Sequence, residues 1–280
     1  MASFVVDEEP WTGGRVSDRV TCVRAHNPSP MTYVGTNSWI VSEPGSFQCV
    51  VIDPSPAGGQ TTRIMEACAE EGLHISAIVV THDHHDHTEG AKELSALTGA
   101  PLFAPKKEIG ADSREGAFLA DRVLREGTFC PFDGSPVLEV FALPGHSSDS
   151  IGLLLPGEKS LFVGDVVFRH GPTVVFHPDG HLGDYLRSLD VIEGLVQEGR
   201  VVRLYPGHGY SIDDPLRALH ATRGHRIERL DQVKKALAEG VPAEANALFD
   251  AVYVGVDERL RWASLRSIEA QLVFLRQEER

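Results

Sequence analysis

The sequence has no hydrophobic run long enough to cross a membrane, and its first residues do not follow the pattern of a targeting signal. A membrane-spanning helix needs about 20 apolar residues, and no apolar stretch of this chain reaches that length. Residues 1–14 are acidic and contain Trp and Pro, unlike a secretory signal or a transit peptide. We therefore expect a cytoplasmic protein that makes no membrane contact.

Cysteine and positive charge are also scarce. The four cysteines, Cys22, Cys49, Cys68 and Cys130, are scattered without a closely spaced pair. Neither a disulfide framework nor a cysteine metal site is indicated, and we expect reduced, mostly buried thiols. The formal charge of −14 disfavours broad electrostatic capture of nucleic acid, which needs a basic surface, but it is compatible with a local basic groove.

What is present is the composition of an ordinary globular protein. With 280 residues, 42% hydrophobic and 24% charged, the chain has room for one large domain, or for one large and one small domain. Strand-like runs and helical patterns, separated by Pro/Gly turns, fill residues 18–205, although 105–135 is harder to assign and 117–124 could be one helix. From residue 216 the pattern is helical. We predict an α/β domain over 1–215 and a small helical domain over 216–280.

The stretch richest in reactive side chains is 81–90, Thr-His-Asp-His-His-Asp-His-Thr-Glu-Gly. It follows an apolar run that predicts a buried strand and precedes a helical pattern. In an extended turn, residues two apart point to the same side, so His82 and His84 can converge on one point, while Asp86 and His87 can face a second. A histidine-rich surface turn has the same composition, but imidazole and carboxylate together suit zinc, iron or manganese.

Three later strand-like runs also end in a ligand-type side chain, each time directly after a glycine. They lead into Pro144-Gly145-His146, Gly164-Asp165 and Pro206-Gly207-His208. Glycine lets the backbone turn sharply or approach another segment closely. A single Gly-His pair carries little weight, but four strand ends that all deliver His or Asp predict one common site at an edge of a sheet.

These motifs resemble those of the metallo-β-lactamase superfamily. The match consists of Thr-His-x-His-x-Asp-His at 81–87, Pro-Gly-His at 144–146 and 206–208, Gly-Asp at 164–165, and an aspartate, Asp53, after an apolar strand. Gly-Thr-Asn at 35–37, the segment 183–189 and His-Arg-Ile-Glu at 225–228 are similar to motifs of the subgroup of β-lactamase-like protein 2 and its bacterial relatives. The resemblance covers nearly the whole chain. It departs at Ser55, where glycine is common, which affects loop shape more than ligation.

The resemblance implies a four-layer αββα sandwich, in which helices flank two mixed sheets and metals sit at one edge, with a small winged-helix-like C-terminal domain beside the site. It also implies two divalent metal ions, zinc first and iron or manganese as alternatives. The implied ligands are His82, His84 and His146 for one ion, and Asp86, His87 and His208 for the other, with Asp165 bridging the two. Asp53 would hold a ligand histidine from behind.

The expected chemistry is hydrolysis. Two divalent ions about 3.5–4 Å apart lower the pKa of a shared water from about 15.7 toward about 7, so that hydroxide is the nucleophile, and we expect Asp86 to hold it by a hydrogen bond. A thioester, an ester or a phosphodiester could be the substrate, and the subgroup resemblance adds single-stranded RNA. True β-lactamases fit less well, because they generally lack an aspartate at the position of Asp165.

Two other classes of function compete with hydrolysis. An iron-dependent oxidoreductase of the persulfide dioxygenase kind is one. A flavodiiron protein fits less well, because such proteins carry glutamate where His84 stands and no flavin domain follows. A catalytically inactive binding module is disfavoured, since all seven ligand positions are filled.

Several remaining side chains are expected to be bystanders. His85 should point away from the ligands, and Tyr185 should pack in a helix. His170, His177 and His181 follow Asp165 and could contact substrate, although solvated histidines are commoner there. His225 carries no argument of its own. The substrate-binding residues, the native metal and the oligomeric state cannot be derived from the sequence.

Overall fold

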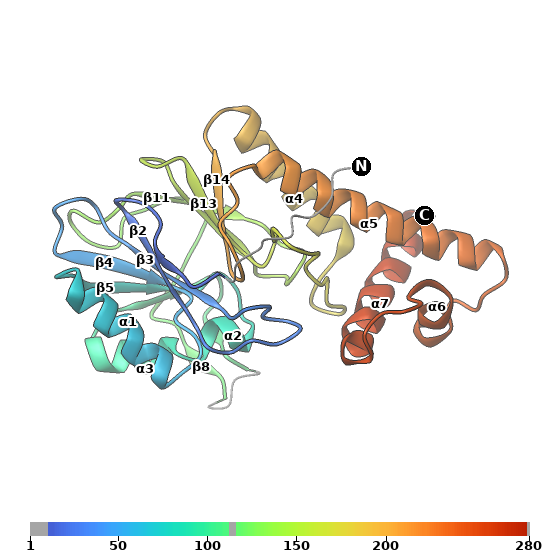
Figure 1. The fold of residues 1–280 in the computed structure, drawn as a ribbon, viewed down its shortest axis with the longest axis horizontal. Coiled ribbons are helices and arrows are strands. Elements are labelled where there is room, and N and C mark those ends of the chain that lie inside the picture. Colours follow the sequence, from blue (N-terminus) through green and yellow to red (C-terminus); the bar gives the residue numbers. More distant parts are fainter. Residues whose placement is uncertain (1–10, 112–115, 279–280) are drawn as a thin grey trace.

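Two facing β-sheets form the centre of the molecule (Figure 1), in a computed structural model that describes residues 11–111 and 116–278. The first sheet contains, in spatial order, β1 (Gly14–Arg15), β2 (Val20–Arg24), β3 (Asn37–Val41), β4 (Gln48–Ile52), β5 (His74–Val79), β6 (Leu102–Ala104) and β9 (Arg122–Val123). The second contains β10 (Gly127–Phe129), β11 (Leu138–Ala142), β12 (Ile151–Leu155), β13 (Ser160–Gly164) and β14 (Arg203–Pro206). Both sheets are mixed, because β4, β5, β6 and β9 are parallel neighbours, as are β13 and β14.

Helices lie on the outer faces of the two sheets and make up the C-terminal part of the chain (Figure 1). They are α1 (Gly59–Glu70), α2 (His85–Thr88), α3 (Ala91–Thr98), α4 (Leu182–Gln197), α5 (Pro215–Ala238), α6 (Ala245–Val252), the 3₁₀ turn η1 (Glu258–Leu260) and α7 (Arg261–Glu278). Helices α1 and α3 pack on the first sheet, and α4 with the first half of α5 packs on the second.

Three hydrophobic cores separate these layers. Trp39 of the first sheet meets Phe162 and Tyr205 of the second in the core between the sheets. The other two cores lie between a sheet and its helices. Along β4, successive residues from Cys49 to Ile52 face alternate cores, so both faces are covered and this part of the strand is apolar throughout. The predicted αββα sandwich is confirmed.

The segment at 117–124 is not a helix, so that prediction is wrong. It contains β8 (Phe118–Leu119), which pairs with β7 (Glu108–Ile109), and then β9, which extends the first sheet beside β6. Asp121 lies between the two strands and accepts a hydrogen bond from the backbone N–H of Leu102. Pairing with the neighbouring strands β7 and β6 decides the conformation here, and local helical periodicity does not.

The C-terminal residues are helical, as predicted. Helices α5, α6 and α7 enclose a fourth core of their own, with Val233, Leu248 and Ile268 at its centre. Between residues 216 and 278 the structure contains no strand, so the strands of a wing are not found in this part of the chain. Helix α5 belongs to two cores, because Leu219 in its first half packs with α4 while Val233 packs in the fourth core.

The structure also bears on the predictions that the cysteines are free thiols and that no helix spans a membrane. All four cysteines are free, and Cys22, Cys49 and Cys68 are buried while Cys130 is exposed. The sulfur atoms of Cys49 and Cys68 lie 3.7 Å apart, a proximity that the sequence did not reveal. No helix within 11–111 or 116–278 is long and apolar enough to cross a membrane. Residues 1–10, most of the stretch judged unlike a targeting signal, lie outside the described residues.

Candidate metal centre

Four strand ends bring the predicted ligands together at one edge of the two sheets. His82 and His84 lie in the turn after β5, and α2 follows at once with two more of the predicted ligands. The remaining three come from the loops after β11, β13 and β14. Three groups have donor atoms within 4.8 Å of one another and could each hold a metal ion: His82, His84 and His146; His82, His87 and Asp165; and Asp86, His87 and His208.

The first group consists of three imidazole rings. His84 Nδ1 lies 3.1 Å from His82 Nε2 and 2.8 Å from His146 Nε2. The rings meet nearly edge to face, so their nitrogens point to a common centre. In this geometry Nδ1 of His84 and Nε2 of His82 and His146 face one another, an arrangement that the sequence could not reveal.

Asp165 lies between this first group and the group of Asp86, His87 and His208, which is called the second group below. Its Oδ1 is 3.2 Å from His87 Nε2, and its Oδ2 is 3.2 Å from His208 Nε2 and 3.7 Å from His146 Nε2. Asp86 Oδ2 completes the second group, 3.3 Å from His208 Nε2. One carboxylate therefore reaches histidines of both groups.

Partners behind the rings fix their orientation. His87 Nδ1 lies 2.9 Å from Asp53 Oδ2, and both Asp53 oxygens also accept hydrogen bonds from Thr81, from its backbone N–H and its hydroxyl, at 2.7 Å. His146 Nδ1 donates to the carbonyl oxygen of Val174 at 2.6 Å. A proton held on Nδ1 leaves the Nε2 lone pair free to point into the centre.

Two of the buried histidines are held neutral. Burial lowers the pKa of His82 well below its ordinary value, and the charges of His87 and His84 lower it further. Burial also lowers the pKa of His146 to about 4. The neutral imidazole is the form that binds a metal ion.

The other two histidines, His87 and His208, lie within ion-pair distance of carboxylates. Burial disfavours ionised Asp165, but the charges of His208 and His87 outweigh it and hold the pKa of Asp165 well below its usual range. Burial would likewise raise the pKa of Asp86, but its contact with His208 at 3.3 Å and the charge of His87 lower it. In return, although burial acts to lower it, Asp165 and Asp86 raise the pKa of His208 to about 9, and Asp165 and Asp53 raise that of His87 well above its ordinary value.

The residues fit a divalent cation. His87 Nε2, His208 Nε2 and Asp165 Oδ1 are buried and have no hydrogen-bond partner. The two nitrogens lie 3.2 Å from oxygens of Asp165 without the geometry of a hydrogen bond. Buried polar atoms in this state are costly, and a metal ion among them would satisfy all three. Nitrogen and carboxylate donors suit zinc, iron or manganese.

Two of the glycines that precede predicted ligands lie too close to other segments to carry a side chain. A Cβ atom on Gly207 would lie 2.3 Å from Asp165 Oδ1 and 2.5 Å from His87 Cε1. Gly145 has a φ of +136°, and a Cβ there would lie 2.2 Å from the Cα of Tyr185. Only glycine allows these backbones to approach so closely, in line with the sequence expectation.

The remaining histidines and Tyr185, named in the sequence analysis, lie outside the three metal-binding groups. His85 is exposed and outside all three groups, and Tyr185 is fully buried, donating its hydroxyl to the carbonyl of Val166 at 2.5 Å. His181 caps α4 by accepting from the N–H of Asp184. His177 is half-buried and does not line the cavity, whereas His170 does.

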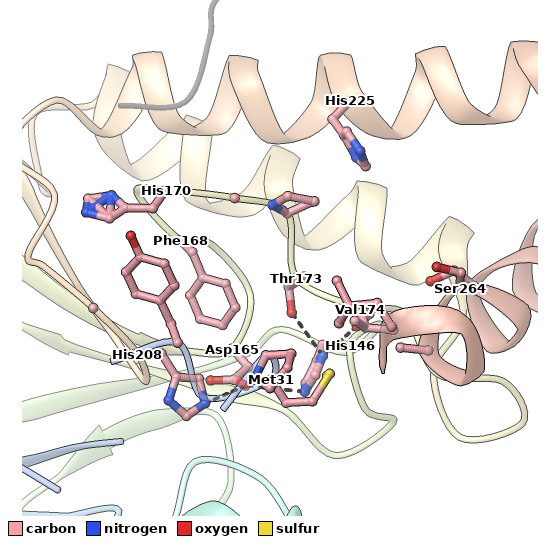
Figure 2. Close-up of a pocket in the computed structure, with 18 of the residues that line it drawn as sticks. Met31, His146, Asp165, Phe168, His170, Thr173, Val174, His208, His225 and Ser264 are labelled. Atoms are coloured by element: carbon pink, nitrogen blue, oxygen red, sulfur yellow. Dashed lines mark hydrogen bonds and ion pairs between the residues drawn. The ribbon is translucent and has the colours of Figure 1, made fainter. Parts of the chain in front are cut away.

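A cavity of about 370 Å³ opens beside the metal centre (Figure 2). His146, Asp165 and His208 form one side of it, and helices α5 and α7 form another. Aromatic and aliphatic residues line much of the remainder: Met31, Tyr33, Phe168, Val174, Tyr210, Tyr253, Val256 and Leu260. His225 points from α5 toward this space in Figure 2. The sequence analysis missed His225, and its place in the motif 225–228 was the one available signal.

Comparisons with known proteins agree with this geometry. The model of the family described as Metallo-beta-lactamase superfamily matches residues 31–208. The Beta-lactamase-like protein 2 homolog of Caenorhabditis elegans is 30% identical over 259 residues, 92% of this chain and 84% of that protein. An Atrochrysone carboxyl ACP thioesterase of Aspergillus fumigatus is 30% identical over 237 residues, 84% and 70% of the two chains. The structure of a Beta-lactamase domain protein from Burkholderia ambifaria superimposes with a TM-score of 0.79 at 20% identity, covering 97% of this chain and 91% of that one.

Proposed function

From the premise that the chain belongs to the metallo-β-lactamase superfamily and is a hydrolase of that fold, we propose that it cleaves the thioester or ester of a small acyl group at two zinc ions. The observation that carries this proposal is the cavity of about 370 Å³, which is lined by three of the predicted ligands, His146, Asp165 and His208. Its volume lies within the roughly 300–1,000 Å³ typical of small-molecule sites, and its lining is largely apolar. Similarity to a protein named as a thioesterase supports the same substrate class.

The metal-binding roles assigned to the seven residues are part of this proposal. When bound, two divalent ions would lower the pKa of a water and polarise the carbonyl under attack. Asp165 reaches histidines of both groups, which supports a bridging role, and Asp86 lies at the edge of the second group, where it could hold a water. Asp53 and the Val174 carbonyl keep protons on the outer nitrogens of His87 and His146, so the inner nitrogens remain donors.

The test is a substrate panel on metal-defined protein. Acyl thioesters, aryl esters, lactones, phosphodiesters and a short single-stranded RNA would be offered to protein loaded with zinc, iron or manganese. We expect turnover of thioesters or esters and no cleavage of RNA. Cleavage of RNA in place of acyl substrates would favour the endoribonuclease, and oxygen consumption by the iron-loaded protein with a persulfide would favour the oxidoreductase. Either result would overturn the proposal.

A matched pair of variants tests the bridging role. Asp165→Ala removes the carboxylate between the groups, and we expect loss of bound metal and a fall in kcat/KM of more than about 100-fold. His85→Ala changes an exposed histidine of the same motif, outside all three groups, and should leave metal content and activity unchanged. Full activity of Asp165→Ala with two bound metals would rule out the bridging role.

A further inference from the structure

The wall of the cavity on α5 carries positive charge. His225, Arg226 and Arg229 occupy adjacent turns of this helix and line the cavity, and Asp165 and His208 of the metal centre line it too. A ligand in the cavity would therefore contact the metals and this wall together.

Arg226 is a buried cation whose partners are neutral. It is 7% exposed, its Nη2 donates to the carbonyl oxygen of Thr173, and its guanidinium lies 5.5 Å from the ring centre of Tyr185. Its Nε is buried without a hydrogen-bond partner. Among the described residues, no carboxylate forms an ion pair with Arg226. A buried charge left without a counter-charge is strongly unfavourable.

Arg229, one turn further along α5, is in a similar state. Its Nη1 donates to Gln232 Oε1 at 2.8 Å and to the carbonyl of Val252 at 3.2 Å, and its guanidinium lies 4.8 Å from the ring centre of Tyr253. Arg223 on the same helix does not line the cavity, and it differs from Arg229 in having acidic partners. It forms ion pairs with Asp190 at 2.5 Å and with Glu193 at 3.8 Å. In a chain with 40 acidic residues, Asp190 and Glu193 neutralise Arg223, whereas the hydrogen bonds of Arg226 and Arg229 go to uncharged groups of the described residues.

His225 reports the resulting positive field. Burial and, after it, the charges of Arg226 and Arg229 together lower its pKa to about 4. An imidazole beside two guanidinium groups loses its proton more readily, because the positive charges disfavour its charged form.

We propose that this wall is an anion subsite, in which Arg226 and Arg229 bind a carboxylate or phosphate carried by the substrate away from the bond that is cleaved. The inference rests on the proposed hydrolase function and narrows its substrate to acyl compounds with a second, negatively charged end. The carbonyl of Thr173 accepts from Arg226, and the Thr173 hydroxyl lies 3.2 Å from His146 Nδ1, so the subsite is one residue removed from the metal centre. A short chain is enough to join the two.

The direct test is binding of matched acids to the zinc-loaded protein by calorimetry at pH 7. Hexanoate, adipate and 6-(phosphonooxy)hexanoate have the same carbon chain and one carboxylate for the metals, but only the last two have an anion at the other end. We expect the better of the two to bind about 10- to 100-fold more tightly than hexanoate, as for a charge-assisted contact. Their order identifies the anion as carboxylate or phosphate.

Variants assign the preference to the wall. The quantity to follow is the ratio of the affinity for the better dianionic acid to the affinity for hexanoate. Arg226→Gln and Arg229→Gln should each reduce this ratio by about tenfold or more. Lys235→Gln, a change of an exposed residue on the same helix, should leave the ratio unchanged. Arg226→Lys retains the positive charge and should retain part of this affinity ratio. If Arg226→Gln does not fold, the single variants Arg226→Lys and Arg229→Gln provide the test. An affinity ratio near one in the native protein, or a ratio that survives both glutamine variants, would overturn the proposal.

Kinetics separate this subsite from the proposed function. The aryl thioesters of hexanoic acid and of adipic acid, the latter with one free carboxylate, would be compared by kcat/KM. Turnover of both at equal rates would retain the hydrolase and reject the subsite. Preferential binding of the diacid with no turnover of any acyl substrate would retain the subsite and reject the hydrolase.

Discussion

Asp53 occupies a backbone conformation that is uncommon for a residue with a side chain. Its φ is +52°, in the left-handed region, and it is almost completely buried. Asp is one of the few residues that tolerate this region. The conformation turns the carboxylate back over the end of β4, where it accepts from Thr81 and faces His87 Nδ1. The left-handed turn at Asp53 thus places its carboxylate where the resemblance implied, behind a histidine of the predicted ligand set.

We predict that Asp53→Asn weakens metal binding without unfolding the protein. Asn tolerates the left-handed region and can still accept from the Thr81 N–H, but it lacks the negative charge that holds the proton on His87 Nδ1. The affinity for the metal at the second group should fall by about 10- to 100-fold, measured by competition with a chelator. Asp231→Asn, on the exposed side of α5, is the control. An unchanged metal affinity would show that Asp53 serves the fold alone.

Proton release should accompany metal binding. In the metal-free protein at pH 7 His208 is protonated, because pH 7 is below its raised pKa of about 9, and His87 is protonated for the same reason. Zinc binds the neutral rings, so adding zinc at pH 7 should release protons. At a pH above 9 the contribution of His208 should vanish. Calorimetry in buffers of different ionisation enthalpy measures the number released, and zero release at pH 7 would contradict the assigned ligands.

At the scale of the element, the strand end is the unit that builds the site. Strands β13 and β14 are parallel neighbours, with Gly164 beside Pro206 in their register. This register places Asp165 and His208, the next ligands along each strand, on the same edge of the sheet. A motif of strand, glycine and ligand could thus be recognised from sequence, because both the apolar run and the glycine are local features.

Gly207→Ala tests this close packing of strand ends. The new methyl group would overlap Asp165 Oδ1 and His87 Cε1, so the two ligands must separate. We expect loss of at least one metal ion per chain and a large fall in activity, with the fold retained, as seen by metal analysis and circular dichroism. Gly194→Ala is a matched control, because this glycine lies in α4 without a positive φ, and a methyl group there would meet open space. Normal metal content in Gly207→Ala would refute the steric account.

Elements that depend on distant partners were not predictable in the same way. The short strands β8 and β9 form because β7 and β6 lie beside them, and their own residues do not distinguish strand from helix. The proximity of Cys49 and Cys68 depends in the same way on α1 lying across β4. Which nitrogen of His84 faces the metals depends on the positions of the neighbouring rings. Each of these facts is set by packing between segments far apart in the chain.

At the scale of the whole molecule, we propose that residues 216–280 form a C-terminal unit with its own core, joined to the sandwich through α5. The fourth core supports this division, and the sharing of α5 between two cores shows how the units are connected. The placement of His225 follows from this connection, because it lies on α5 ahead of Val233, the first buried residue of the fourth core, and points toward the cavity (Figure 2).

Ile268→Ala tests whether the C-terminal unit supports the cavity. Ile268 is fully buried in the fourth core, so the substitution should cost about 2–5 kcal/mol of unfolding free energy, measured by urea denaturation. Because α7 lines the cavity, KM should rise while metal content is unchanged. Ile227→Ala, 41% exposed on α5, should change stability by no more than about 0.5 kcal/mol. Loss of metal in Ile268→Ala would show that the two units are not separable in this sense.

The position of α5 across both cores has a consequence for how such proteins could diversify. Every proposed cation ligand precedes residue 209, whereas Arg226, Arg229 and the α7 wall follow Gly224, a helical glycine with open space around it. A chimera joined at Gly224 that carries the last fifth of a relative would replace the α5 and α7 walls of the cavity. The proposed metal ligands would stay unchanged. Reactivity and choice of substrate would then be inherited separately, from consecutive stretches of a single gene.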